Sequence, residues 1–198
     1  MAALPVAALT ALQGLRKTGE IRPRQKVLIQ GGSGGVGTFA VQLAKVFGTE
    51  VTAVCSTRNL EMARSIGADH VIDYTREDFT KNQQRYDIIY AANGYHPISA
   101  YKRVLNPQGI YVCAGGAISQ FFQVMLLGSL MSEKDGKQVR SMGVAKVIRE
   151  DLVCLGDLLK DGKIIAVIDR CYPLRETVEA FRYIEETHAQ GKVIINVV

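Results

Sequence analysis

Apolar residues occur along the chain in two patterns, short continuous runs and stretches with helical spacing. Five continuous runs, at residues 26–30, 50–55, 70–74, 86–91 and 109–113, predict buried strands. Stretches with helical spacing lie between them, at residues 35–47, 58–66 and 98–105. Short strands that alternate with helices favour a parallel sheet with right-handed crossovers. We therefore expect an α/β fold, with a doubly wound parallel sheet and helices on both faces.

The two ends and the middle of the chain add further elements. Leu9, Leu12 and Leu15 have helical spacing and precede the first strand. The pattern at residues 75–79 predicts a short helix, with Thr75 and Asp78 in positions like those of a capping box. Residues 121–127 are strongly apolar, residues 132–140 read as a polar loop, and residues 150–160 as an amphipathic helix. Two more strands, at 164–168 and 192–198, flank a helix at 174–188.

Composition narrows the class of protein. Hydrophobic residues make up 47% of the 198 positions, which is enough for a full core. The net charge of +5 is mild, and no run of basic residues occurs, so we expect no nucleic-acid partner. The small excess of positive charge instead favours a site for an anionic small molecule. No stretch reaches the roughly 18 apolar residues that a membrane-spanning helix needs.

The four cysteines, Cys55, Cys113, Cys154 and Cys171, are far apart and form no C-x-x-C pair. This spacing is typical of small core residues in a reducing compartment, and the chain start lacks the basic segment of a signal peptide. We therefore expect a cytoplasmic protein with no zinc or other metal site.

A glycine-rich turn carries the first functional signal. Residues 29–38 contain five glycines and lie between a predicted strand and a predicted helix. Gly32-x-Gly34-x-x-Gly37 has the spacing of a Rossmann dinucleotide-binding turn, where phosphates meet bare backbone at a helix N-terminus. The candidate pyrophosphate contacts are Gly32, Ser33, Gly34, Gly35, Val36 and Gly37. A Walker A loop is excluded because Thr38 stands where that motif requires lysine.

The end of the second strand bears on the choice of cofactor. An acidic residue there usually holds the ribose hydroxyls of NAD, but this chain has Ser56 and Arg58 and no carboxylate. Arg58 is suited to pair with a 2′-phosphate, and Ser56 to donate a hydrogen bond to it. The alternative is that Arg58 is a solvated residue of the next helix. The pattern favours NADP(H), and the missing acid argues against an adenosine site of the methyltransferase type.

Five segments carry a further signal when taken together: residues 3–11, the glycine turn, residues 65–74, residues 162–174 and residues 189–195. They resemble the medium-chain dehydrogenase/reductase superfamily, in its zinc-independent branch of quinone oxidoreductases and enone reductases. The resemblance covers essentially the whole chain. It implies an oxidoreductase that transfers hydride from NADPH to a quinone or an α,β-unsaturated carbonyl.

The resemblance also implies roles for single residues. The 2′-phosphate contacts fall on Ser56, Arg58 and Tyr74, the tyrosine after the third strand. The turns after the fourth and fifth strands border the nicotinamide, which adds Ala92, Asn93, Gly115 and Gly116 as candidates. Residues 91–97 lack the acidic residue and valine that many relatives have there. His96 in this turn is either a proton donor or a structural residue, and we assign no catalytic residue.

Members of this branch also have an N-terminal, β-rich GroES-like domain that builds much of the substrate cleft. This chain resembles the cofactor domain without it. We expect an NADP-binding domain over residues 1–163, which includes an apolar lid or interface segment at 117–150. Residues 164–198 then form the part that packs toward the GroES-like domain. Exposed apolar strands there favour a homo-oligomer, as a dimer. The alternative function is a non-catalytic module that binds or senses NADPH.

Overall fold

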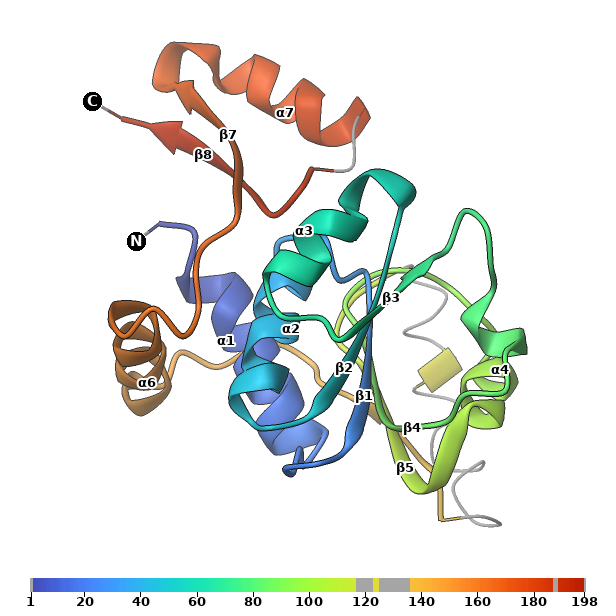
Figure 1. Cartoon of the computed structure of the whole chain (residues 1–198). Coiled ribbons are helices and arrows are strands. Elements are labelled where there is room, and N and C mark those ends of the chain that lie inside the picture. The colour runs from blue at the N-terminus through green and yellow to red at the C-terminus, as the bar shows by residue number, and fades with distance from the viewer. Residues whose placement is uncertain (1, 117–122, 125–135, 187–188, 198) are drawn as a thin grey trace.

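The computed structural model describes residues 2–116, 123–124, 136–186 and 189–197 (Figure 1). Its centre is a six-stranded sheet in the order β3-β2-β1-β4-β5-β6, and all five strand pairs are parallel. The strands are β1 (Lys26–Gln30), β2 (Glu50–Cys55), β3 (His70–Asp73), β4 (Tyr86–Ala91), β5 (Leu105–Cys113) and β6 (Gln138–Ser141). The doubly wound α/β fold predicted from the sequence is confirmed.

Helices cover both faces of this sheet, which explains why the strands are continuous apolar runs. One face packs against α1 (Pro5–Gln13), α2 (Gly37–Val46), α3 (Leu60–Ser65) and α6 (Arg149–Lys160). A π-helical turn, Gly14–Thr18, continues α1. The other face packs against α4 (Ile98–Arg103) and the 3₁₀ turn Phe79–Lys81. The first core lies between the sheet and α1, α2, α3 and α6, and the second lies between the sheet and α4. Within β1, Val27 and Ile29 belong to the first core and Leu28 to the second.

The helix predicted at residues 75–79 is wrong. The Asp73 carboxylate accepts hydrogen bonds from the backbone N–H of Thr75 (3.0 Å) and from its hydroxyl (2.7 Å). This local bond folds the chain into a turn, in which the N–H groups of Arg76 and Glu77 reach the Asp73 carbonyl. Asp78 instead caps the 3₁₀ turn that follows, because its carboxylate accepts from the N–H of Thr80 at 2.9 Å.

The polar segment predicted as a loop at residues 132–140 is wrong over its last residues. Residues 138–141 form β6, the edge strand, which pairs with β5 from Ile110↔Gln138 to Cys113↔Ser141. All four residues of β6 are half-buried, as an edge strand with polar side chains allows. Residues 132–135 and most of the apolar segment 121–127 lie outside the described residues.

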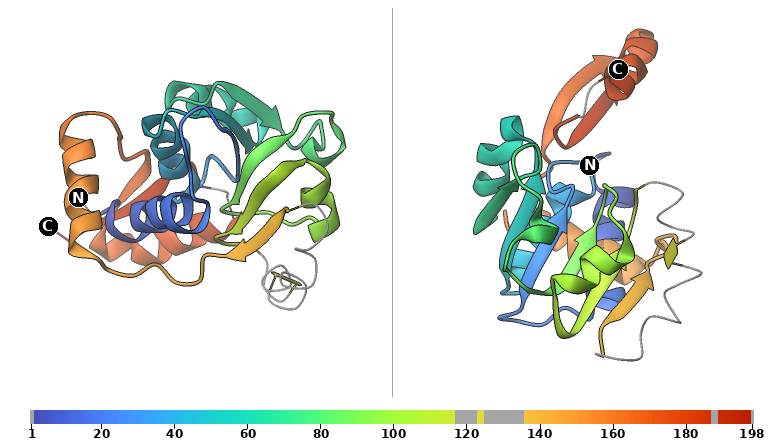
Figure 2. Two further views of the ribbon diagram at one scale, coloured as in Figure 1. Left: turned by 90° about the horizontal axis from the view of Figure 1, so that it is seen from below. Right: turned by 90° about the vertical axis from the view of Figure 1, so that its right-hand side faces the viewer.

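The C-terminal residues build a second, smaller unit. β7 (Ile168–Pro173) and β8 (Lys192–Asn196) form a two-stranded parallel sheet, joined through the 3₁₀ turn Leu174–Glu176 and α7 (Thr177–Glu186). Figure 2 shows this unit projecting from the body that contains the large sheet. The helix predicted at 174–188 and the strand predicted at 192–198 are present with shorter bounds, and residues 187, 188 and 198 are not described.

The strand predicted at residues 164–168 is wrong, because the strand begins only at Ile168. The apolar run is buried against the large body instead: Ile164 is fully buried in the first core. Ile165 bonds to the side chain of Gln42 on α2, donating its N–H to Oε1 (2.7 Å) and accepting from Nε2 (3.0 Å). A buried amide side chain thus replaces the strand partner that the sequence pattern suggests.

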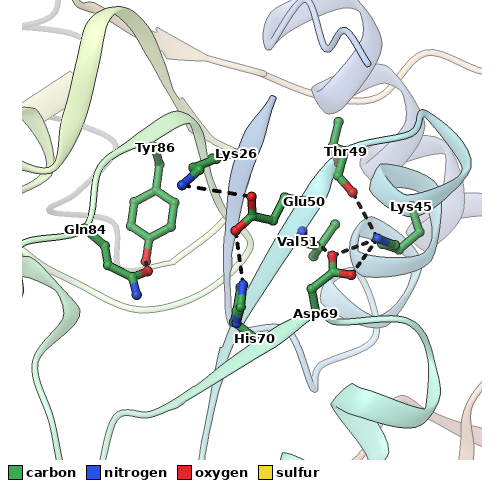
Figure 3. A network of polar contacts seen from close by, with 9 residues as sticks. All are labelled: Lys26, Lys45, Thr49, Glu50, Val51, Asp69, His70, Gln84 and Tyr86. Atoms are coloured by element: carbon green, nitrogen blue, oxygen red, sulfur yellow. Dashed lines mark hydrogen bonds and ion pairs between the residues drawn. The ribbon is translucent and has the colours of Figure 1, made fainter. Parts of the chain in front are cut away.

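Ionic contacts join the amino ends of the first strands (Figure 3). Glu50 lies 4.0 Å from the Lys26 ammonium and 3.1 Å from the His70 ring. Asp69 accepts from Lys45 at 2.7 Å and from the N–H of Val51 at 2.7 Å. These side chains are partly exposed, so each pair adds little stability. They occupy the amino edge of the sheet, and ligands of such sheets bind at the opposite, carboxyl edge.

Candidate cofactor site

A cavity of about 590 Å³ opens at the carboxyl ends of β1, β2 and β4. Here the strand order reverses between β1 and β4, which is the usual ligand position in a doubly wound sheet. The lining residues come from these strand ends, the turns after β1 to β4, the 3₁₀ turns Thr57–Asn59 and Phe79–Lys81, and the C-terminal unit. They are Gln30, Gly31, Ser33, Gly34, Val54, Cys55, Ser56, Asn59, Tyr74, Phe79, Asn93, Gly94, Tyr95, His96, Ile184, Glu185 and Ala189.

The glycine turn leaves several backbone donors available. The N–H groups of Gly31 and Gly32 donate to the Val54 carbonyl at 3.1 and 3.0 Å, and that of Gly34 donates to the Gly31 carbonyl at 3.1 Å. Among the described residues, no group accepts from the N–H groups of Ser33 and Val36. These groups lie at the N-terminus of α2, where the helix dipole favours an anion.

The glycines of the turn serve different purposes. A Cβ at Gly37 would overlap the Gly31 carbonyl oxygen, so Gly37 is required for the approach of helix and strand. A Cβ at Gly32 would lie 3.0 Å from the Cβ of Ala53 on β2. A Cβ at Gly34 would meet only the Gly31 carbonyl, at an ordinary 3.6 Å. The protein itself therefore does not need a glycine at position 34, which lines the cavity.

Asn59 connects the glycine turn to the end of β2. It is buried, and its Nδ2 donates to the hydroxyls of Ser33 at 3.1 Å and Ser56 at 3.0 Å. Tyr74 lines the same side of the cavity with 55% of its surface exposed. Arg58 is exposed on the 3₁₀ turn Thr57–Asn59, next to Ser56, and is not among the lining residues.

An acidic residue does lie near this end of the cavity, on β3 rather than β2. The Asp73 carboxylate accepts from the Thr57 hydroxyl at 2.5 Å and from Thr75, and these hydrogen bonds lower its pKa. It is turned into this cluster and does not line the cavity. Burial, followed by the charge of Asp73, raises the pKa of the neighbouring Cys55 thiol to about 11, so this cavity residue is a neutral thiol.

Aromatic rings line the other side of the cavity, opposite the ends of β2 and β3. The ring of His96 makes edge contacts with Phe79 at 5.1 Å and with Tyr101 at 5.6 Å between centroids. Burial lowers the pKa of His96 despite the nearby Asp78, which leaves a neutral ring at pH 7. Gln30 lies at the end of β1, where its Oε1 accepts from the Tyr101 hydroxyl at 2.7 Å. This bond fixes the orientation of the Gln30 amide beside the cavity.

The turns after β4 and β5 pack closely on one another. A Cβ at Gly115 would overlap the Ala92 carbonyl oxygen, and Gly116 has φ +114 with a Cβ position 2.8 Å from the Gly94 carbonyl. A Cβ at Gly31, φ +77, would lie 3.0 Å from Asn93. Of these turn residues, Asn93 and Gly94 line the cavity, whereas Ala92, Gly115 and Gly116 do not.

The structure brings five of the predicted cofactor residues to the cavity: Ser33, Gly34, Ser56, Tyr74 and Asn93. Gly32, Gly35, Val36 and Gly37 lie in the same turn but outside the lining. The sequence reasoning missed Gln30, Asn59, Phe79 and the residues from the C-terminal unit. Gln30 carried a usable signal, since it is a polar residue that ends a buried apolar strand.

A parallel sheet of this strand order, with a glycine turn at the switch point, defines the class of Rossmann-type dinucleotide-binding domains. Comparison with known proteins identifies the family within that class. Residues 66–195 match the family described as zinc-binding dehydrogenase. The chain belongs to the medium-chain dehydrogenase/reductase superfamily, in the zinc-independent branch of quinone oxidoreductases and enone reductases.

Individual relatives agree with this placement. The chain is 34% identical to the chloroplast envelope quinone oxidoreductase homolog of Arabidopsis thaliana, over 98% of this chain and 60% of that protein. It is 37% identical to 2-methylene-furan-3-one reductase of Solanum lycopersicum, over 98% and 46%. The structure of the quinone oxidoreductase from Coxiella burnetii matches with TM-score 0.86 and 31% identity, over 100% of this chain and 60% of that one. The chain therefore spans about half to three fifths of these relatives.

Two predictions concern features that the chain should lack. Within the described ranges, no three His, Cys, Asp or Glu side chains come together as metal ligands. No helix in the same residues is long and apolar enough to cross a membrane. The absence of zinc stays a prediction, which is tested below.

Proposed function

We propose that the chain binds NADPH and forms the cofactor-binding part of a reductase that transfers hydride to a quinone or an α,β-unsaturated carbonyl. The observation that carries the proposal is the cavity at the switch point, lined by the glycine turn, Ser56 and Tyr74. The relatives named quinone oxidoreductase and 2-methylene-furan-3-one reductase support the reaction class.

The chain's own residues would bind and orient the cofactor. The free N–H groups of the glycine turn would hold the pyrophosphate, and the turns with Ala92, Asn93, Gly115 and Gly116 would border the nicotinamide. When bound, the reduced nicotinamide supplies the hydride, while the protein contributes position and electrostatics. We assign no residue to proton transfer, although neutral His96 lines the cavity.

The preference for NADPH over NADH rests on charge around Ser56. The end of β2 has no carboxylate, and the nearby Asp73 is engaged by Thr57 and Thr75. A 2′-phosphate would therefore meet the hydroxyl of Ser56 and the guanidinium of Arg58 rather than a competing anion. Charge-assisted hydrogen bonds of this kind are worth about 1.5–3 kcal/mol each.

We infer that the chain has two parts with different contacts. Residues 1–163 would form the NADP-binding domain, with a lid or interface segment at 117–150, and residues 164–198 would pack toward a GroES-like domain. The exposed apolar side chains of α7 and the turn before it, Leu174, Val178, Phe181 and Ile184, support an apolar contact surface there. We expect this chain alone to form a homo-oligomer, as a dimer. The free cysteines Cys55, Cys113, Cys154 and Cys171 support a cytoplasmic location.

A second candidate function is a non-catalytic module that binds or senses NADPH. It requires only the cofactor site, and no residue of the cavity is assigned to proton transfer. The two candidates share the cofactor site and differ in whether a substrate is turned over.

The test has three parts. Titration of the purified chain with NADPH and NADH should give tighter binding of NADPH, and sedimentation should show self-association. We expect negligible oxidation of NADPH with 1,4-benzoquinone or a simple enone by this chain, and turnover by a protein that also has the GroES-like domain. No turnover by that longer protein would favour the non-catalytic candidate. Equal affinities for the two cofactors would contradict the assignment of Ser56 and Arg58.

A further inference from the structure

Lys192, the first residue of β8, lies against the glycine turn although it belongs to the C-terminal unit. A Cβ at Gly35 would lie 2.8 Å from the Cδ of Lys192 and 3.4 Å from its Nζ. The stem of the lysine therefore crosses the bare backbone at Gly35, and its ammonium is beside the N-terminus of α2. The residue is half-buried.

Backbone contacts on both sides hold Lys192 in this place. The N–H of Gly191 donates to the Ser33 carbonyl at 2.8 Å, and Gly34 and Gly191 form a parallel bridge. The N–H of Lys192 itself donates to the Val167 carbonyl at 2.9 Å. Gly191 has φ +81, and a Cβ there would overlap that same carbonyl oxygen, so the chain needs glycine before the lysine. Lys192 is thus delivered to the turn by ordered backbone.

Several donors without a partner meet at this point. Within the described residues, the Lys192 ammonium has no ion pair and no hydrogen bond, and no group accepts from the N–H groups of Ser33 and Val36. The carboxylate that lines the neighbouring cavity, Glu185, is exposed on α7 and makes no ion pair with Lys192. A cation beside the positive end of a helix is unfavourable unless an anion lies between them.

We propose that Lys192 binds the pyrophosphate of the dinucleotide, an inference that rests on the proposed function. The C-terminal unit then supplies part of the cofactor site, as a cation that faces the free N–H groups of the glycine turn. The pyrophosphate is common to NADPH and NADH, so Lys192 sets affinity for both. Ser56, Arg58 and Tyr74 act on the 2′-phosphate and set the preference between them.

Three ligands separate these contacts: NADPH, ADP-ribose, which has the pyrophosphate without a 2′-phosphate, and adenosine 2′-monophosphate, which has the reverse. The variants are Lys192→Gln, which keeps the stem over Gly35 and removes the charge, and Lys192→Arg, which keeps the charge. Lys163→Gln is the matched control, because Lys163 is a surface lysine paired with Asp161 at 3.3 Å. Affinities are measured by calorimetry at low and at high salt, and thermal melting checks that each variant is folded.

We expect Lys192→Gln to weaken NADPH and ADP-ribose by about tenfold, with a smaller salt dependence, and to leave adenosine 2′-monophosphate unchanged. Lys192→Arg and Lys163→Gln should bind all three like the unchanged chain. Unaltered affinity of Lys192→Gln for ADP-ribose would overturn the inference and leave the proposed function standing. An equal loss for all three ligands would also overturn it, since that pattern indicates a displaced C-terminal unit. If the unchanged chain bound neither NADPH nor ADP-ribose, the proposed function itself would fail.

Discussion

Gly34 offers a way to separate folding from cofactor binding within one turn. Gly34 is not among the glycines with positive φ, and a Cβ there would have only an ordinary contact, 3.6 Å from the Gly31 carbonyl. Replacement of glycine by alanine at such a position stabilises a protein by about 0.4–1 kcal/mol, because the unfolded chain loses freedom. For a chain of this length, 1 kcal/mol shifts the melting temperature by about 2–4 °C. Gly34→Ala should therefore melt at the original temperature or a few degrees above it.

Gly37, three residues further on, is the matched contrast. Its Cβ would overlap the Gly31 carbonyl oxygen, and backbone on both sides leaves no flexible atom to move. Forced overpacking of this kind costs about 3 kcal/mol or more, so Gly37→Ala should melt about 6 °C or more below the unchanged chain.

Substitutions at Gly34 should affect cofactor binding much more than they affect folding. A ligand at 100 times its Kd adds about 2.7 kcal/mol, which raises the melting temperature of the unchanged chain by about 5–11 °C. Gly34→Ala should lose most of this rise and Gly34→Val all of it, since the added methyl groups occupy the space of the pyrophosphate. The assay is thermal melting followed by circular dichroism, with and without NADPH. The chain has no tryptophan, so direct excitation of nicotinamide fluorescence gives an independent Kd.

Two results would contradict these roles of Gly34. If Gly34→Ala melts far below the unchanged chain, a glycine at position 34 is needed for packing. If Gly34→Val is folded and still shows the full rise with NADPH, the phosphates lie elsewhere.

Three further predictions concern other parts of the molecule. Arg58→Ala should reduce NADPH affinity by about 1.5–3 kcal/mol and leave NADH affinity unchanged; an unaltered preference in paired titrations would reject the 2′-phosphate assignment. Burial raises the pKa of Asp151, but hydrogen bonds from Gln13 and Arg16 outweigh it and hold that pKa below the ordinary 3.8. The contribution of Asp151 to the free energy of unfolding is therefore complete above pH 3.8. It is lost as the pH falls through the lowered pKa that Asp151 has in the folded protein. In urea unfolding at pH 7, Asp151→Asn should lower the free energy of unfolding by about 2 kcal/mol, and it should reduce the loss of stability at acid pH. An unchanged loss of stability at acid pH would contradict the ion pair. Elemental analysis of chelator-washed protein should find no stoichiometric zinc, and one zinc per chain would refute the metal-free prediction.

Local sequence pattern was sufficient for five of the six strands of the large sheet. The strands β1 to β5 are apolar runs because both faces are covered, so continuous burial is visible as continuous hydrophobicity at residues such as Val27, Leu28 and Ile29. The glycine turn could be found from the spacing of Gly32, Gly34 and Gly37 alone, because that spacing is a local signature of one strand–turn–helix segment.

Other elements depended on competition between local interactions and burial. The segment 75–79 looked helical, but the Asp73 side chain captures the N–H of Thr75 before a helix can begin. Residues 164–167 looked like a strand, but Ile165 finds its partners in the Gln42 side chain. Neither partner is visible as a pattern, since one acts over two residues and the other over more than a hundred.

The composition of the site was decided mainly by the tertiary structure. The sequence alone determined an α/β fold, a glycine turn and a second strand that ends without an acid. Only the folded chain places Asn59 between Ser33 and Ser56, turns Asp73 into a hydroxyl cluster, and brings Lys192 to Gly35 from the far end of the chain. These contacts join segments far apart in sequence, and their energy depends on distance in space, which no local pattern of residues records.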